Sequence, residues 1–394
     1  MNYKTIYRTY HVANRRLQAG TWIQIIDGSE GDYLKSIIAG FKEHDLDIRS
    51  LPGEIFESIR ERKFDRIKEL IESIDRRLVD APEWLALSSL FIALGRYHIA
   101  LLLREIAMLR IEDYEGRIDK WLIADLIIGK KIERKELDSI IPFLKWTRLM
   151  RSACGISVFN PKFQQVLKTC DYSPVDEEDQ KFLDLVKNKK LAIVGPLKLS
   201  AQEENELAEF ELLAKLNDLE YFVQEQENSK RIPDIVYYTR KREAALNDFK
   251  GACKSCPTFI VGKRGKQAFA QSGLRSHYRK LDDYNAYTLN GGLNMIPRMI
   301  IDIAFFKPQE LKVFGVDLYT SLNFDKGYGG IQQTDWKVVF DHFINHDLIT
   351  QYKVMQGLYE NGIFTADGRL EGIMQMGVGK FLDFFEQKFQ EVYY

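Results

Sequence analysis

The sequence predicts an α/β fold, with a mostly parallel sheet in the second half of the chain and an α-helical N-terminal domain before it. After residue 188, short apolar runs alternate with helical segments, whereas residues 54–147 show helical periodicity throughout. The polar, acidic stretch from Ser173 to Gln180 separates the two halves. Because 394 residues exceed the usual size of one hydrophobic core, we expect two domains, 1–180 and 188–394.

The helical domain is predicted from the spacing of its apolar side chains. A helical pair is expected across Trp84–Ile111, turned near Gly95, and no 34-residue period repeats around it. Trp22–Ile26 is the one short strand expected in this half. The residues that carry the helical period before this pair are Ile55, Ile59, Phe64, Ile67, Leu70, Ile71 and Ile74.

The second half alternates predicted strands and helices, which indicates parallel strands with helices on both faces. Ligands of such sheets bind beyond the carboxyl ends of the strands, and these ends form one candidate rim: Gly195, Tyr238–Thr239, Asn290–Gly292 and Asp317–Tyr319. The predicted strands are Leu191–Val194, Glu220–Val223, Ile235–Tyr238, Thr258–Val261 and Leu311–Val316. The predicted helices are Glu203–Leu216, Asn294–Phe306 and Leu348–Tyr359.

Composition excludes several classes of function. The net charge of -1 gives no field that would attract nucleic acid. No apolar run reaches the roughly 18–20 residues of a membrane span, and no apolar signal core follows Met1, so a cytoplasmic location is expected. The Cys253–Cys256 pair lacks further ligands at zinc spacing, and the one Asp-x-Asp pattern, Asp45–Asp47, lies in the helical half. We therefore expect no bound metal.

Five segments taken in order resemble the bacterial sialyltransferases of glycosyltransferase family 42, and more faintly those of family 29. The resemblance covers roughly Asn188 to Ile363 and implies a Rossmann-like sheet of variant GT-A type. Pro196 and Thr239 stand where the family usually has Asn, so the contacts to the nucleoside differ. The segments that carry the resemblance are Ala192–Gly195, Asp234–Thr239, Thr288–Gly291, Leu311–Tyr319 and His342–His346.

The resemblance also implies site residues. His346 matches the family's catalytic base, and a histidine suits the removal of a proton from an acceptor hydroxyl. Tyr319 and Tyr328 match two tyrosines that hold the donor phosphate, where hydrogen-bond donors stabilise the charge of the leaving group. The residues expected to bind the nucleotide are Gly195, Pro196, Thr239, Asn290, Gly291, Gly292 and Asp317.

The function so implied is inverting transfer of an acidic nonulosonic sugar or Kdo from a CMP-activated donor to a bacterial surface glycan, without metal or further cofactor. Two alternatives stay open: a UDP- or GDP-sugar transferase, and a non-enzymatic helical interaction protein with a degenerate transferase domain. Peripheral association with the inner membrane and homo-oligomerisation also stay open. The basic residues Arg275, His277, Arg279 and Lys280 are expected on a solvated face, or against the carboxylate of an acidic ligand.

Overall fold

The computed structural model describes residues 54–112, 174–216, 231–239, 257–262, 276–281, 293–322, 336–340 and 348–393, with gaps in the first, second and seventh of these ranges. The strands predicted at Trp22–Ile26 and Glu220–Val223 lie outside the described residues.

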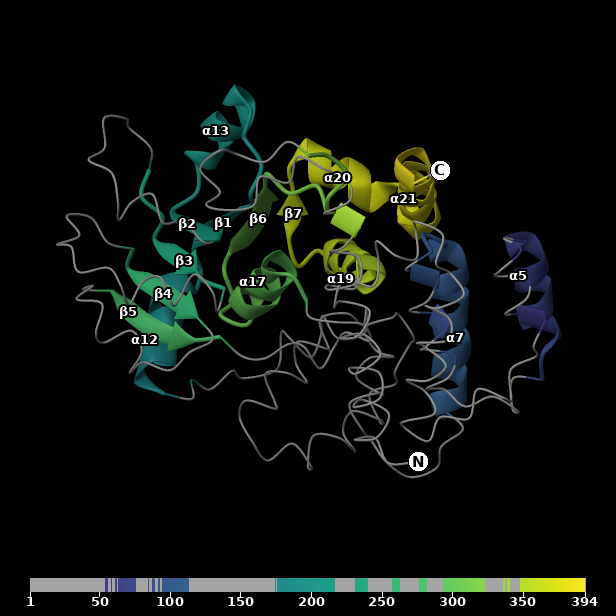
Figure 1. The fold of residues 1–394 in the computed structure, drawn as a ribbon. Helices are drawn as coiled ribbons and strands as arrows, with labels where there is room; N and C mark the ends of the chain where they lie inside the picture. Colours follow the sequence, from purple (N-terminus) through teal and green to yellow (C-terminus); the bar gives the residue numbers. More distant parts are fainter. Residues whose placement is uncertain are drawn as a thin grey trace, which may run out of the picture.

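A seven-stranded sheet in the order β5-β4-β3-β2-β1-β6-β7 forms the centre of the second half (Figure 1). Every neighbouring pair is parallel, which confirms the α/β class with a parallel sheet. The strand order reverses at β1, because β2 to β5 extend to one side and β6 and β7 to the other. The strands are β1 Lys190–Val194, β2 Leu212–Leu216, β3 Ile235–Tyr237, β4 Phe259–Gly262, β5 His277–Lys280, β6 Glu310–Phe314 and β7 Thr365–Ala366.

The central strands are apolar on both faces because both faces of the sheet are covered. In β1, Leu191 and Ile193 belong to the main core, whereas Ala192 and Val194 point into a smaller core on the other face. This second core includes Phe314 of β6, whose ring packs edge-on to Phe210 with the centroids 5.7 Å apart. The continuous apolar run of β1 is the pattern that predicted this strand from the sequence.

Helices pack against the sheet, and further helices follow on the side of β7 (Figure 1). Phe182 of α12 contacts Phe306, just after α17, with the ring centroids 4.7 Å apart, so both helices lie on the same face. The helices of the second half are α12 Glu177–Val186, α13 Ala201–Leu207, α17 Met295–Ala304, α19 Leu348–Glu360, α20 Gly368–Gln375 and α21 Gly377–Tyr393. The helices α17 and α19 confirm the predictions for Asn294–Phe306 and Leu348–Tyr359.

The acidic stretch from Ser173 to Gln180 is in part the beginning of α12. The side chain of Asp176 caps this helix by accepting a hydrogen bond of 2.9 Å from the backbone N–H of Asp179. Acidic side chains fill the first turn, where they interact favourably with the helix dipole. The charges at this point therefore mark the start of a helix.

The prediction of one helix across Glu203–Leu216 is wrong. The helix α13 ends at Leu207, and β2 begins five residues later at Leu212. A capping box formed by Ser200 and Glu203 begins α13, and none of its residues is buried. The strand β2 lies between β1 and β3, so its long-range pairing overrides the helical propensity of its residues.

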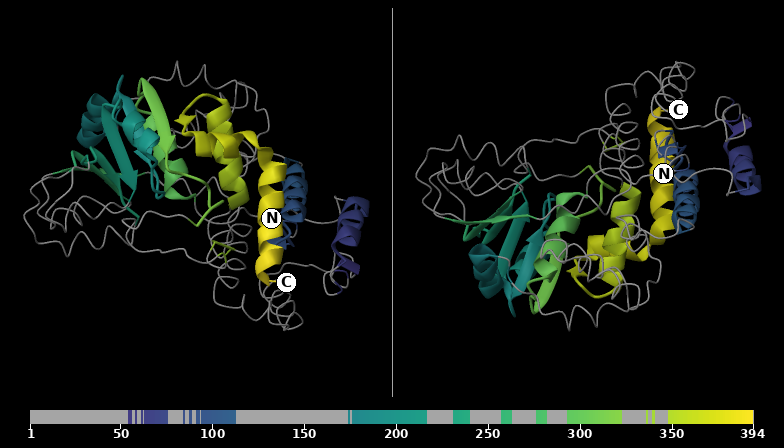
Figure 2. Two further views of the ribbon diagram at one scale, coloured as in Figure 1. Left: turned by 90° about the horizontal axis from the view of Figure 1, so that it is seen from above. Right: turned by 90° about the horizontal axis from the view of Figure 1, so that it is seen from below.

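In the first half, α5 Phe64–Ser73 and α7 Tyr97–Glu112 are helical as expected. Figures 1 and 2 show α7 running beside α21, and Tyr97 packs edge-on to Phe389 with the ring centroids 6.5 Å apart. His98 Nε2 lies 2.8 Å from Asp383 Oδ1. No helix among the described residues is long and apolar enough to cross a membrane.

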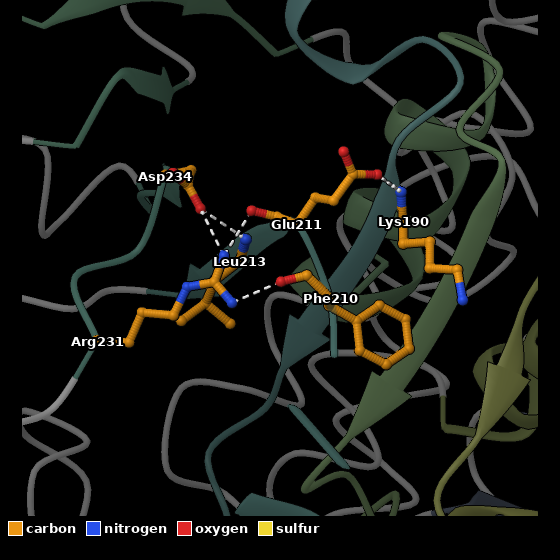
Figure 3. A network of polar contacts seen from close by, with 6 residues as sticks. All are labelled: Lys190, Phe210, Glu211, Leu213, Arg231 and Asp234. Carbon is orange, nitrogen blue, oxygen red and sulfur yellow. Dashed lines mark hydrogen bonds and ion pairs between the residues drawn. The ribbon is translucent and has the colours of Figure 1, made fainter. Parts of the chain in front are cut away.

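Polar contacts tie together the amino ends of β1, β2 and β3 (Figure 3). Arg231 donates to the carbonyl oxygens of Phe210 and Glu211 at 2.6 and 2.5 Å, while the carboxylate of Asp234 accepts from the backbone N–H of Leu213 at 2.9 Å. The charges at this edge are engaged in holding the strands in register. Ligands of open parallel sheets bind at the opposite, carboxyl edge.

Candidate ligand site at the carboxyl edge of the sheet

The carboxyl ends of β1 and β6 lie side by side where the strand order reverses, with Val194 opposite Phe314. The turns that follow are hydrogen-bonded to each other: the N–H of Gly195 donates to the carbonyl of Phe314 at 2.8 Å, and that of Leu197 to the carbonyl of Gly315 at 3.1 Å. Such a reversal is the usual ligand position of open parallel sheets. It brings together Gly195 and Pro196 with the segment that contains Asp317 and Tyr319.

Packing between these two turns requires a glycine at position 195. A Cβ on Gly195 would lie 2.4 Å from Val316 Cγ2 and 2.5 Å from the carbonyl oxygen of Gly315. Gly315 itself has a φ of +64°, in the left-handed region. The close contact of the two turns thus explains Gly195 without a ligand, while a nucleotide contact by this residue stays a prediction.

Substitution of Gly195 by Ala is expected to lower the free energy of unfolding by about 1–3 kcal/mol, because backbone atoms must shift to admit the methyl group. Gly372→Ala is the matched control, since a Cβ there meets nothing within 4 Å in the middle of α20. The free energy of unfolding of this control should rise by up to about 1 kcal/mol, because alanine has a higher helix propensity than glycine. Urea denaturation of the two variants checks the pair, and equal effects would contradict the packing explanation.

Asp317 holds the turn that presents Tyr319. Its carboxylate accepts from the N–H of Tyr319 at 3.0 Å, the N–H of Ser321 at 2.8 Å and the hydroxyl of Ser321 at 2.5 Å. Leu318 and Tyr319 both have positive φ, 48° and 69°, which is uncommon outside glycine. Burial raises the pKa of Asp317, although these hydrogen bonds oppose the rise. The carboxylate predicted to bind the nucleotide therefore also fixes a strained turn.

The hydroxyl of Tyr319 is positioned by the beginning of α17. Asn294 Nδ2 donates to the Tyr319 hydroxyl at 2.9 Å, and the backbone N–H of Asn294 donates to Gln351 Oε1 at 3.0 Å. Asn294 is the N-cap residue of α17, yet its side chain makes no capping bond to that helix. The beginning of α17 thus contacts Tyr319 in the turn after β6, and α19 contacts the same Asn294 that orients Tyr319.

The N-terminus of α17 has the properties of an anion-binding end. Its first turn holds no acidic side chain, and Pro297 in that turn has no N–H. The remaining N–H groups and the helix dipole favour a negatively charged group at this position. The predicted nucleotide-binding residues Asn290, Gly291 and Gly292 lie three to five positions before the first residue of this helix in the sequence, outside the described residues.

Asp367, which is not among the residues predicted from the sequence, joins a third turn to the same edge. Its carboxylate accepts from the N–H of Gly315 at 2.6 Å and from the N–H of Leu370 at 2.8 Å, so it links β6 to α20. The signal that identifies it is an Asp in the N-cap position before a helix. Burial raises the pKa of Asp367, opposed by these two hydrogen bonds and by the positive charge of Arg369.

The raised pKa of Asp367 predicts a pH dependence of stability. The folded state holds this proton more tightly than the unfolded state, so the contribution is complete below the ordinary value of 3.8 and is lost as pH rises through the folded pKa. Asp367→Asn removes this titration. We expect the stability advantage of the wild type over this variant to shrink as pH rises from about 3.8, measured by urea denaturation. An advantage that grows over that range would contradict the assignment.

The remaining predicted residues are placed as follows. Thr239 follows β3, which is two strands away from β1. It therefore lies at the same edge of the sheet, but not at the pair β1 and β6 where the strand order reverses. Pro196 is half-buried beside Gly195. Tyr328 and His346 lie outside the described residues, although His346 precedes the first residue of α19 by only two positions in the sequence.

The prediction of a solvated basic face is wrong for Arg279. This arginine lies in β5 with its side chain 1% exposed, paired with Asp302 and 3.5 Å from Asp179. Its guanidinium lies between the rings of Phe182 and Phe306, 4.5 and 4.9 Å from their centroids. His277 and Lys280 of the same strand are exposed, as expected, and Arg275 lies outside the described residues.

Comparison with known proteins gives no match: no family model, no curated protein and no solved structure is significantly similar to this chain.

Proposed function

We propose that this chain is a glycosyltransferase with a Rossmann-like sheet of the variant GT-A type, and that it transfers an acidic nonulosonic sugar or Kdo from a CMP-activated donor. The observation that carries the proposal is the position of Tyr319. Tyr319 follows β6, which neighbours β1 where the strand order reverses, and its hydroxyl accepts a hydrogen bond from Asn294 at the N-terminus of α17. A phenol and a helix N-terminus at one point suit the single phosphate of a CMP-sugar.

In this reaction the acceptor hydroxyl attacks the anomeric carbon of the donor and loses its proton to His346. The new glycosidic bond forms with inversion while the bond from the anomeric carbon to the phosphate oxygen breaks, and CMP leaves with that electron pair. Tyr319, Tyr328 and the first N–H groups of α17 stabilise the charge on the departing phosphate. The acceptor is a bacterial surface glycan, and the reaction takes place on the cytoplasmic side of the membrane.

Nucleotide binding tests the donor assignment. Calorimetric titration with CMP, CDP, UDP and GDP, each with and without EDTA, is expected to show binding of the cytidine nucleotides that EDTA leaves unchanged. A preference for UDP or GDP that EDTA abolishes would contradict the CMP donor but keep a transferase. The absence of binding by all four nucleotides would contradict the transferase itself and favour an interaction protein.

Replacement of Tyr319 by Phe is expected to weaken CMP binding about tenfold, the effect of losing one hydrogen bond to a charged group. Tyr359→Phe is the matched control, because its hydroxyl donates to Glu371 at 2.9 Å near the other end of α19. Calorimetry of both variants should separate them. Equal CMP affinities in the wild type and Tyr319→Phe would remove Tyr319 from the site.

A further inference from the structure

The first turn of α19 contacts both the helical region and the candidate site through consecutive residues. Thr350 Oγ1 accepts a hydrogen bond of 3.2 Å from Arg104 Nη1 of α7. Gln351 Oε1 accepts the hydrogen bond of 3.0 Å from the backbone N–H of Asn294. Both side chains are buried, with exposed fractions of 2% for Thr350 and 0% for Gln351. A single turn of helix therefore joins α7 to the N-terminus of α17.

On the α7 side, the contact to Thr350 belongs to a buried polar network. Arg104 Nε donates to Ser88 Oγ at 3.2 Å, and the hydroxyl of Ser88 donates to the carbonyl oxygen of Ala100 at 2.9 Å. Buried charged groups are costly to separate from their hydrogen-bond partners. The position of α7 and the orientation of the first turn of α19 are consequently linked.

On the site side, the bond from Gln351 fixes the residue that orients Tyr319. Asn294 donates to Gln351 through its backbone and to Tyr319 through its side chain, so movement of Gln351 alters both contacts. Adjacent residues of a helix are separated by about 100° of rotation. A rotation of α19 that broke the contact of Thr350 with Arg104 would also displace Gln351.

We propose that α19 couples the packing of α7 to the donor site, with Gln351 as a positioning residue for Asn294 and Tyr319, an inference that rests on the proposed function for the identity of the ligand. Through this connection the helical region controls affinity for the nucleotide without contacting it. A change in the position of α7 loosens the N-terminus of α17 and weakens the binding of the donor phosphate.

The coupling is tested by Thr350→Val, which keeps the shape of the side chain and removes the acceptor for Arg104. We expect hydrogen exchange at the Asn294 amide to accelerate about five- to tenfold and CMP affinity to fall by a similar factor. Thr350→Ser restores the hydroxyl and should restore both values. Glu105→Gln is the matched control, because it removes a neighbouring ion pair of 3.5 Å between Glu105 and Lys353 on the same two helices.

Wild-type exchange at Asn294 in Thr350→Val would overturn the coupling, and the same acceleration in Glu105→Gln would overturn the route through Thr350. Gln351→Leu and Gln351→Glu test the second step directly, since the glutamate still accepts from the Asn294 amide and the leucine does not. We expect rapid exchange and weak CMP binding in Gln351→Leu and rescue of both in Gln351→Glu. If the wild type binds no nucleotide, the proposed function fails, whereas the exchange measurements still decide whether the coupling exists.

Discussion

Replacement of Asp302 by Ala is expected to lower the free energy of unfolding by about 3–5 kcal/mol, the cost of removing one partner from a buried ion pair. Asp302 is fully buried on α17 and pairs with Arg279 of β5. It also accepts a hydrogen bond of 2.7 Å from the hydroxyl of Tyr237 on β3. Its removal therefore disturbs contacts that join one helix to two strands, and urea denaturation measures the loss.

The surroundings of Arg279 explain why the loss cannot be made up by solvent. Its guanidinium lies between Phe182 and Phe306, and the second carboxylate, that of Asp179, is 3.5 Å away. Burial raises the pKa of Tyr237 well above its ordinary value, and the negative charge of Asp302 raises it further. The tyrosine therefore remains a neutral donor to Asp302 across the ordinary pH range.

A double variant separates the lost ion pair from general damage to the core. Arg279→Met keeps an apolar chain between the two rings and removes the charge. Asp302→Ala combined with Arg279→Met should be considerably less destabilised than the sum of the two single variants. Additive effects, or a cost below about 1 kcal/mol for Asp302→Ala, would show that the pair contributes little to the fold.

The strands β1 and β4 could be predicted from the sequence because burial on both faces leaves continuous apolar runs. The strand β5 lacks such a run: His277 and Lys280 are exposed, and Arg279 is buried only because Asp302 and Asp179 neutralise it. Those partners come from other elements. A strand whose burial depends on distant charges has no local signal.

The candidate site, too, contains some residues that could be predicted from the sequence and others that could not. Strand ends locate Gly195, Asp317 and Tyr319, because the carboxyl ends of parallel strands share one edge. The residues that hold them in place were not predictable. Gln351 is 57 residues from Asn294, and Asp367 is 52 residues from Gly315. Contacts at such separations follow from the arrangement of the helices, which no local pattern specifies.

Replacement of His346 by Ala is expected to lower the rate of sugar transfer by about 10²-fold or more, because the acceptor hydroxyl then loses its general base. The same variant should bind CMP as the wild type does, since proton removal contributes to the transition state and not to binding of the nucleotide. Transfer rates at saturating CMP-sugar and calorimetry with CMP measure the two quantities. His346 precedes α19, whose first turn contacts the site through Gln351.

His98→Ala is the matched control, because this histidine is exposed on α7 and contacts Asp383 of α21. It should leave the transfer rate unchanged. The wild-type rate should fall at low pH, where protonation removes the general base, and His346→Ala should lose this dependence. A variant that loses CMP affinity in proportion to its rate would place His346 in nucleotide binding. A variant with the full rate and the same pH profile would remove the base from the mechanism, since a proton acceptor cannot be deleted without changing both.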